Sequence, residues 1–260
     1  VNKQSAGVLK EIRQAFLDED KEKAAQLTRN NFNGLAAYEE KDETPFRFGS
    51  FTTMGELYVE TGLNELRMSN YRRILSLDSA MVVVQFDKDG VQYQRKYFIS
   101  YPDSVMVMKF TANQSGKQNL ILSYCPNSEA KSNLRADGKD GLVYTGVLDN
   151  NGMKFAFRIK AIHKGGTLEA ENDRLIVKGA DEVVFLLTAD TDYKMNFNPD
   201  FKDPKTYVGN DPEQTTRIMM DQAVQKGYDE LYRNHEADHT ALFNRVRLQL
   251  NPDISSPNLP

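Results

Sequence analysis

Two histidines near the carboxyl end of the chain have the spacing of a zinc site. The segment His235-Glu-Ala-Asp-His239 fits the pattern H-E-x-x-H, in which two imidazoles one helical turn apart share a zinc ion and the glutamate, here Glu236, acts as general base. A catalytic zinc needs a third ligand, for which the sequence offers His163 or a carboxylate. The same stretch carries apolar side chains typical of an ordinary packing helix, namely Leu231, Leu242 and Phe243. A structural helix without metal is therefore favoured over a zinc protease.

Two further pairs of side chains could do chemistry, but neither has a supporting motif. Hydrolysis of a glycosidic bond needs two carboxyl groups about 5–10 Å apart, and Glu56 and Glu60 share one face of a predicted strand. Their alternation with apolar neighbours indicates the solvent side. Cys125 and His163 could form a nucleophile pair, yet a small buried or half-buried thiol is the favoured interpretation of Cys125.

A loop rich in phenylalanine precedes the first predicted strand. Its sequence, Phe46-Arg-Phe-Gly-Ser-Phe-Thr-Thr53, sets aromatic rings beside polar groups. Such a mixture suits carbohydrate binding, because a sugar ring has an apolar face and a rim of hydroxyl groups. The alternative is that these phenylalanines plug one end of the domain.

The elements that must position these residues are mostly strands. Between Gly55 and Ala189 the apolar residues recur largely with period two, in about ten short segments separated by turn signals. The turns Asp87-Lys-Asp-Gly90 and Asn151-Gly152 predict hairpins. No predicted strand lies between Tyr124 and Leu142. Because no helices alternate with the strands, the pattern favours a large antiparallel sandwich over a parallel α/β fold.

Helical periodicity occurs at both ends, which gives a three-part division. We expect helices in residues 1–34 that pack on the sandwich, with Asp20 capping the second of them. The sandwich takes residues 35–210. Residues 211–260 are expected to hold linker helices that begin at Asp211-Pro212 and are interrupted at Gly227, a last strand with alternating Val246, Leu248 and Leu250, and a proline-rich tail.

Composition excludes several classes of function. The 260 residues include 33 Lys and Arg against 37 Asp and Glu, for a net charge of −4, so we expect neither nucleic acid nor a membrane surface as partner. No apolar run approaches the roughly 18 residues of a membrane span. Cys125 is the sole cysteine, which excludes a disulfide framework. The chain has no P-loop, G-x-G-x-x-G or G-x-S-x-G motif, and we expect no cofactor.

Six motifs in register resemble a known family over nearly the whole chain. They are Phe51-Thr-Thr-Met-Gly-Glu-Leu-Tyr-Val59, Tyr71-Arg-Arg-Ile-Leu-Ser-Leu-Asp78, Asp89-Gly-Val-Gln-Tyr-Gln-Arg-Lys-Tyr-Phe98, Ser100-Tyr-Pro-Asp103, Gly179-Ala-Asp-Glu182, and Tyr228-Asp-Glu-Leu followed by the segment from His235 to Val246. In this order they resemble the N-terminal domain of glycoside hydrolase family 95, the inverting α-L-fucosidases.

The resemblance implies a mostly β fold, a large antiparallel two-sheet supersandwich with helices near the N-terminus and a C-terminal linker helix. In that family an (α/α)6 barrel follows and carries the catalytic carboxylates and asparagines, and we expect it beyond Pro260. The family's helix that matches His235–His239 has no zinc role. The chain would thus be an accessory domain, itself inactive and without catalytic or metal-binding residues, of an enzyme that removes terminal α-linked L-fucose or L-galactose with inversion.

The resemblance also suggests partners and a place of action. The expected partners are the chain's own catalytic barrel and a fucosylated glycan, with Phe48, Phe51, Thr52 and Thr53 at the rim of the active site. The family's first strands have no counterpart here, so we expect open sheet edges and self-association through them. A periplasmic or secreted location follows from the family. A stand-alone carbohydrate-binding module and a purely structural domain stay open as alternatives.

Overall fold

The computed structural model describes two compact units of the chain, residues up to Phe51 and residues from Thr52 onward. The described residues are 7–32, 53–64, 66–126, 130–148, 151–171, 173–200, 203 and 205–246. No described helix is long and apolar enough to cross a membrane.

The first unit is a pair of helices, α1 (Leu9–Leu17) and α2 (Lys21–Phe32). Three small or branched side chains, Ile12, Ala15 and Ala24, are buried between them. Asp20 begins the second helix as predicted, because its Oδ1 accepts a hydrogen bond of 3.0 Å from the backbone N–H of Lys23. The packing of these helices on the sandwich stays a prediction.

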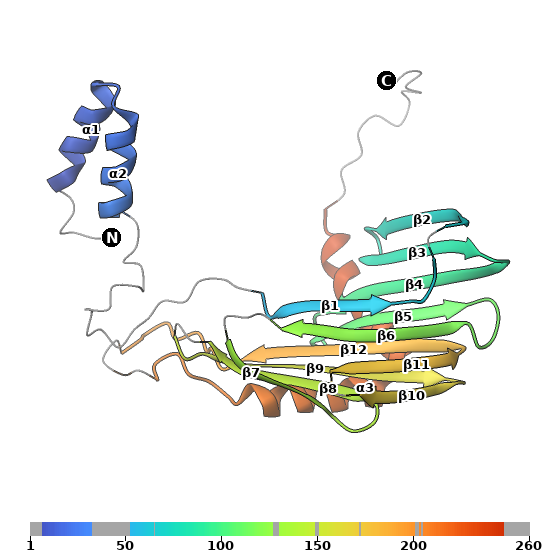
Figure 1. Ribbon diagram of the computed structural model, residues 1–260. Coiled ribbons are helices and arrows are strands. Elements are labelled where there is room, and N and C mark those ends of the chain that lie inside the picture. The colour runs from blue at the N-terminus through green and yellow to red at the C-terminus, as the bar shows by residue number, and fades with distance from the viewer. Residues whose placement is uncertain are drawn as a thin grey trace, which may run out of the picture. The chain divides into compact units, whose positions relative to one another are not determined.

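The second unit is a two-sheet antiparallel sandwich, as predicted (Figure 1). The four-stranded sheet has the order β1 (Gly55–Glu60), β6 (Gln118–Pro126), β11 (Arg174–Ala180) and β10 (Thr167–Glu171). The eight-stranded sheet has the order β2 (Met68–Ser76), β3 (Met81–Lys88), β4 (Val91–Ser100), β5 (Val105–Ala112), β12 (Glu182–Thr191), β9 (Lys154–Lys164), β8 (Gly141–Leu148) and β7 (Ala130–Ala136).

The main core lies between the two sheets and is rich in aromatic rings. Tyr124 of the small sheet stacks on Phe157 of the large one, with ring centroids 4.9 Å apart. Phe110 and Phe185 meet edge to face at 5.7 Å. Fully burying a side chain of this size stabilises the fold by roughly 1.5–3 kcal/mol. A shift of one residue in the pairing of a strand would turn its buried rings out to solvent, so burial of this layer favours the observed register.

A third layer covers the opposite face of the large sheet. Helix α3 (Pro212–Phe243) lies along that face (Figure 1), where Phe98, Val107 and Leu186 pack against Met220 and Leu231. Asp211 caps the helix as predicted, with its Oδ1 accepting from the N–H of Glu213 at 3.1 Å. Gly227 interrupts it, since its φ of 72° and ψ of 172° are not helical.

Two expectations about local structure need correction. Strand β7 was not predicted, because its sequence, AKSNLRA, has few apolar residues; it forms the edge of the large sheet, where pairing with β8 on one side suffices. Cys125 is exposed rather than buried or half-buried, because it falls on the outward face near the end of β6. The prediction that Glu56 and Glu60 face solvent is confirmed.

Candidate functional site

The two histidines of the zinc motif anchor α3 to a turn of the large sheet. His235 is buried, and its Nε2 lies 3.0 Å from the carbonyl oxygen of Ser79 and 3.1 Å from that of Ala80. The Nε2 of His239 lies 2.7 Å from the carbonyl oxygen of Leu77. A carbonyl oxygen can only accept, so both Nε2 atoms must carry a proton. A protonated imidazole nitrogen cannot also bind a metal ion.

The remaining parts of the zinc motif also have other roles. Glu236 accepts a hydrogen bond of 3.0 Å from the hydroxyl of Tyr232. The Nδ1 of His163 lies 2.8 Å from the carbonyl oxygen of Gly165, in the turn after β9. No group of three or more His, Cys, Asp or Glu side chains suited to a metal ion occurs in the described part of the chain. The zinc-protease alternative therefore finds no support, and the structural interpretation of this helix is the better one.

A buried carboxylate makes the second connection between α3 and the sheet. Asp103 follows β4, and its side chain is 2% exposed. It accepts hydrogen bonds from the hydroxyl of Ser100 at 2.6 Å, the Nζ of Lys226 at 2.7 Å and the Nδ2 of Asn234 at 3.1 Å. Burial alone would raise the pKa of Asp103, but these donors and the lysine charge outweigh it and hold the pKa below its ordinary value. The carboxylate is a structural anion without access for a substrate.

The sandwich has two hollows of interest, and the larger one is lined mostly by apolar side chains. It has a volume of about 510 Å³ and lies where the end of α3 passes β4. Its lining includes Ile99, Tyr101, Leu242 and Phe243, together with the edges of His235 and His239. Asp238 is its one carboxylate. This groove suits an apolar segment of polypeptide better than a sugar, which needs several hydrogen-bonding partners.

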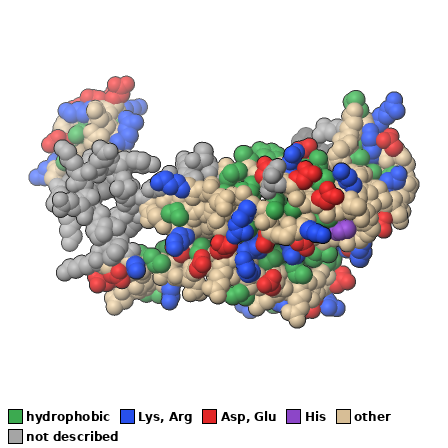
Figure 2. Space-filling model, turned by 60° about the horizontal axis from the view of Figure 1, so that its bottom comes forward, with side chains coloured by type: hydrophobic (Ala, Val, Ile, Leu, Met, Phe, Trp, Pro, Cys, Tyr) green, Lys and Arg blue, Asp and Glu red, His purple; other side chains and the backbone are tan. Residues whose placement is uncertain are grey.

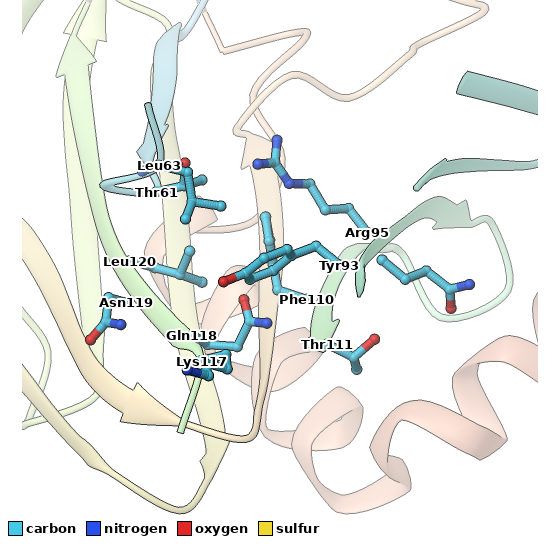
Figure 3. Close-up of a pocket in the computed structure, with 11 residues that line it drawn as sticks. Thr61, Leu63, Tyr93, Arg95, Phe110, Thr111, Lys117, Gln118, Asn119 and Leu120 are labelled. Atoms are coloured by element: carbon cyan, nitrogen blue, oxygen red, sulfur yellow. Dashed lines mark hydrogen bonds between the residues drawn. The ribbon is translucent and has the colours of Figure 1, made fainter. Parts of the chain in front are cut away.

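The smaller hollow is polar and lies between the end of β1 and strands β4 to β6 (Figure 3). Tyr93 and Gln118 line it, and the guanidinium of Arg95 lies over the rings of Phe86 and Phe110 at 5.1 and 5.8 Å. Gln118 is 3% exposed, and its Nε2 has no hydrogen-bond partner within the described ranges. The cavity volume of about 10 Å³ has room for roughly one water molecule. A sugar ring does not fit.

The structure describes one of the four residues expected at a substrate rim. Phe48, Phe51 and Thr52 lie outside the described residues, and Thr53 is exposed just before β1. Sequence reasoning missed the anchoring role of Asp103, Lys226 and Asn234. A motif search could not have found it, because a turn and two positions of a distant helix supply the three groups.

Figure 2 shows acidic and basic side chains interspersed over one face of the molecule. Such mixing gives no extended basic patch for a phosphate backbone on that face.

Comparison with known proteins places the chain among glycoside hydrolases. It is 27% identical over 229 residues to "Probable alpha-fucosidase A" of Aspergillus niger, covering 84% of this chain and 28% of that protein. It is 26% identical over 226 residues to "Alpha-L-fucosidase 2" of Arabidopsis thaliana, covering 77% of this chain and 26% of that protein. The chain thus spans about a quarter of the length of these curated relatives.

A solved structure and a family model complete the comparison. The "Putative kojibiose phosphorylase from human microbiome" aligns with a TM-score of 0.49 at 10% identity, over 71% of this chain and 27% of that chain; a likeness at this level adds nothing to the argument. The prediction of a glycoside-hydrolase-related N-terminal domain is confirmed. A family model matches residues 1–196, and the chain therefore belongs to the family described as "Glycosyl hydrolase family 65, N-terminal domain".

Proposed function

We propose that this chain is the accessory N-terminal domain of an α-L-fucosidase-like glycoside hydrolase. The parent enzyme would remove terminal α-linked L-fucose, or a related sugar such as L-galactose, with inversion, and this chain alone would be inactive. The observation that carries the proposal is the match of most of this chain to about a quarter of two proteins named as fucosidases.

The chemistry of inversion supports placing catalysis elsewhere. An inverting hydrolase needs a general acid and a general base about 6.5–9.5 Å apart, on opposite sides of the sugar. The apolar groove contains one carboxylate, Asp238, and the polar hollow contains none. Neither hollow therefore offers the required pair. The proposed role of the sandwich is to support the catalytic barrel of the parent.

The rim residues that precede the first strand belong to the same proposal. Phe48, Phe51, Thr52 and Thr53 would lie at the mouth of the barrel and contact the glycan. In the full-length parent, Phe51→Ala should raise KM or lower kcat several-fold, with Phe46→Ala in the same loop as the matched control. Unchanged constants for Phe51→Ala would remove this part of the proposal. A periplasmic or secreted location is part of the same proposal, because the glycans concerned lie outside the cytoplasm.

The substrate of the parent is tested with a panel of aryl glycosides. We expect hydrolysis of the α-L-fucoside, weaker hydrolysis of the α-L-galactoside and none of the β-L-fucoside. Proton NMR of the first product should show the β-anomer, since inversion changes the configuration at the anomeric carbon. Release of the α-anomer, or no hydrolysis of either α-glycoside, would contradict the proposal.

A stand-alone carbohydrate-binding module is the second candidate. The loop after β12 favours it, because it exposes Tyr193, Met195 and Phe197 beside Asn196 and Asn198. Calorimetric titration of the 260-residue chain with fucosylated oligosaccharides separates the two candidates. Saturable binding by the chain alone supports a binding module, whereas no heat of binding supports an accessory domain.

A further inference from the structure

Exposed apolar side chains gather where the end of α3 passes the end of β4 (Figure 1). Ile99 and Tyr101 are 66% and 83% exposed, and Leu242 and Phe243 are 58% and 41% exposed. All four line the apolar groove of about 510 Å³. Exposed apolar side chains that cluster around one hollow mark a site of interaction rather than ordinary surface.

Hydrogen bonds and ring contacts between α3 and the large sheet hold the walls of this groove in place. The Nε2 of His239 donates to the carbonyl oxygen of Leu77 at 2.7 Å, and the Nε2 of His235 lies 3.0 Å from that of Ser79. The ring of His235 also stacks on Phe98 of β4 at 4.9 Å. A surface fixed in this way loses little conformational entropy when a partner docks on it.

The charge of the lining sets a requirement for the partner. Asp238 is the one carboxylate among the described residues that line the groove, and no Lys or Arg is among them. A partner that covers Asp238 without a cation leaves a buried charge unpaired, which is costly. The groove therefore fits an apolar segment with a lysine or arginine beside it.

The comparisons indicate where such a segment comes from. The chain belongs to a family described as an N-terminal domain, and it spans about a quarter of the length of two proteins named as fucosidases. In a protein of that length the remaining polypeptide follows α3, and the last turn of α3 forms one wall of the groove. A domain attached there is held beside the groove at high effective concentration.

We propose that this groove is the docking site for the catalytic domain of the parent enzyme, which inserts an apolar segment with a basic side chain facing Asp238. This docking rests on the proposed function, which supplies the partner, and it adds the surface through which the sandwich supports that partner. Interfaces between domains of one chain bury about 600–1,500 Å². The groove forms the centre of such a contact, where aromatic anchors such as Tyr101 and Phe243 contribute most.

A second copy of the chain is a poorer occupant. Twofold pairing through this surface sets one groove against another, and two hollows do not fill each other. It also brings the Asp238 carboxylates of the two copies together, and like charges repel. Contact between the groove and a different surface of a second copy does not close into a dimer but continues into a filament or a ring.

Hydrogen exchange of the full-length parent and of the 260-residue chain, measured without substrate, tests the docking. The informative amides are those of residues 99–104, at the end of β4, and of residues 240–243, at the end of α3. In the parent they should exchange at least about tenfold more slowly than in the chain alone, because the docked domain excludes water and stops the end of α3 from fraying.

Equal exchange of these amides in the two proteins would overturn the proposal. If both are fast, nothing in the parent covers the groove, and if both are slow, residues of the 260-residue chain cover it already. Slow exchange that appears in the chain only as its concentration rises would mean that a second copy occupies the groove, which also overturns the proposal.

Two matched substitutions on α3 separate docking from a local change in the helix. Leu242 lines the groove and Ile218 does not, and they are 58% and 50% exposed. In the parent, Leu242→Asp should restore fast exchange in residues 99–104, on the opposite wall, whereas Ile218→Asp should leave it slow. Both should leave Tm of the 260-residue chain unchanged, because neither side chain is buried there. Slow exchange of residues 99–104 in Leu242→Asp would contradict the docking.

The charge of the partner is tested at Asp238. In the parent, Asp238→Lys should speed exchange of residues 99–104 several-fold, because it sets one cation against another. The exposed Asp229→Lys on the same helix is the control and should have no effect. Equal exchange in these two variants would overturn the assignment of a basic partner segment.

The docking and the proposed function fail separately. A parent that shows the slow exchange but hydrolyses no α-L-fucoside supports the docking and contradicts the proposed function. A parent that hydrolyses the fucoside without slow exchange in residues 99–104 contradicts the docking alone.

Discussion

Asp103 shows how one carboxylate can hold a long helix on a sheet. Its three donors come from the end of β4 and from both sides of the Gly227 kink. Asp103→Asn should lower the free energy of unfolding by about 1–3 kcal/mol, because it leaves buried donors poorly paired. Urea denaturation measures the change, with the exposed Asp229→Asn on the same helix as the control. A loss equal to that of the control would contradict the anchoring role.

The same residue predicts a dependence of stability on pH. The folded-state pKa of Asp103 lies below its ordinary value, so its contribution is complete above the ordinary pKa of about 4 and is lost as the pH falls through the folded value. Unfolding free energies measured between pH 7 and pH 3 should fall more steeply in the parent chain than in Asp103→Asn. Parallel curves would mean that this carboxylate does not contribute. Glu182 pairs with Lys109 and Lys164, whose hydrogen bonds and charges outweigh burial and lower its pKa as well. These pairs therefore contribute to the acid-induced loss of stability in both proteins.

The two histidines of α3 should differ in their effect on stability. His235 is buried and stacks on Phe98 at 4.9 Å, so His235→Ala should cost about 2 kcal/mol from lost packing and a lost hydrogen bond. His239→Ala should cost less, because His239 lies nearer the surface. Dialysis against a chelator should leave Tm unchanged. A drop in Tm restored by zinc would show that the motif binds metal after all.

Among the elements, the link between the two sheets places the tightest demand on the backbone. Gly165 and Gly166 carry the chain from β9 in the large sheet to β10 in the small one, and Gly166 has a φ of 65°. A Cβ at Gly166 would lie 2.2 Å from the carbonyl oxygen of Lys178, whereas a Cβ at Gly179, with a φ of 64°, meets nothing within 4 Å. An alanine at Gly179 would therefore suffer backbone strain alone, whereas an alanine at Gly166 would suffer both backbone strain and a steric collision.

Paired substitutions test this link. Gly179→Ala should cost about 1 kcal/mol from the left-handed backbone alone, and Gly166→Ala should cost more, because the strands must also move apart. Thermal unfolding of both variants measures the difference. Equal losses of stability in the two variants would mean that the steric collision at Gly166 is relieved without a cost in free energy.

The elements also show what the sequence could predict. Period-two patterns and turn residues located most strands, and Asp20, Asp211 and Gly227 marked helix starts and the kink, because these signals are local. Strand β7 was missed since a polar edge strand has no such signal. The contacts of Asp103 and His235 depend on residues far apart in the chain, which local patterns cannot bring together. Of the four rim residues the structure describes only Thr53, and the rim role of all four stays a prediction.

For the whole molecule, the central proposal is that the sandwich supports a catalytic domain of the parent enzyme and performs no hydrolysis itself. The match to a hydrolase N-terminal domain and the absence of a carboxylate pair in either described hollow support it. The most direct measurement is the rate of hydrolysis of an aryl α-L-fucoside by the purified 260-residue chain beside the full-length parent. We predict hydrolysis by the parent and a rate equal to the blank for the chain. Hydrolysis by the chain above the blank would contradict the account.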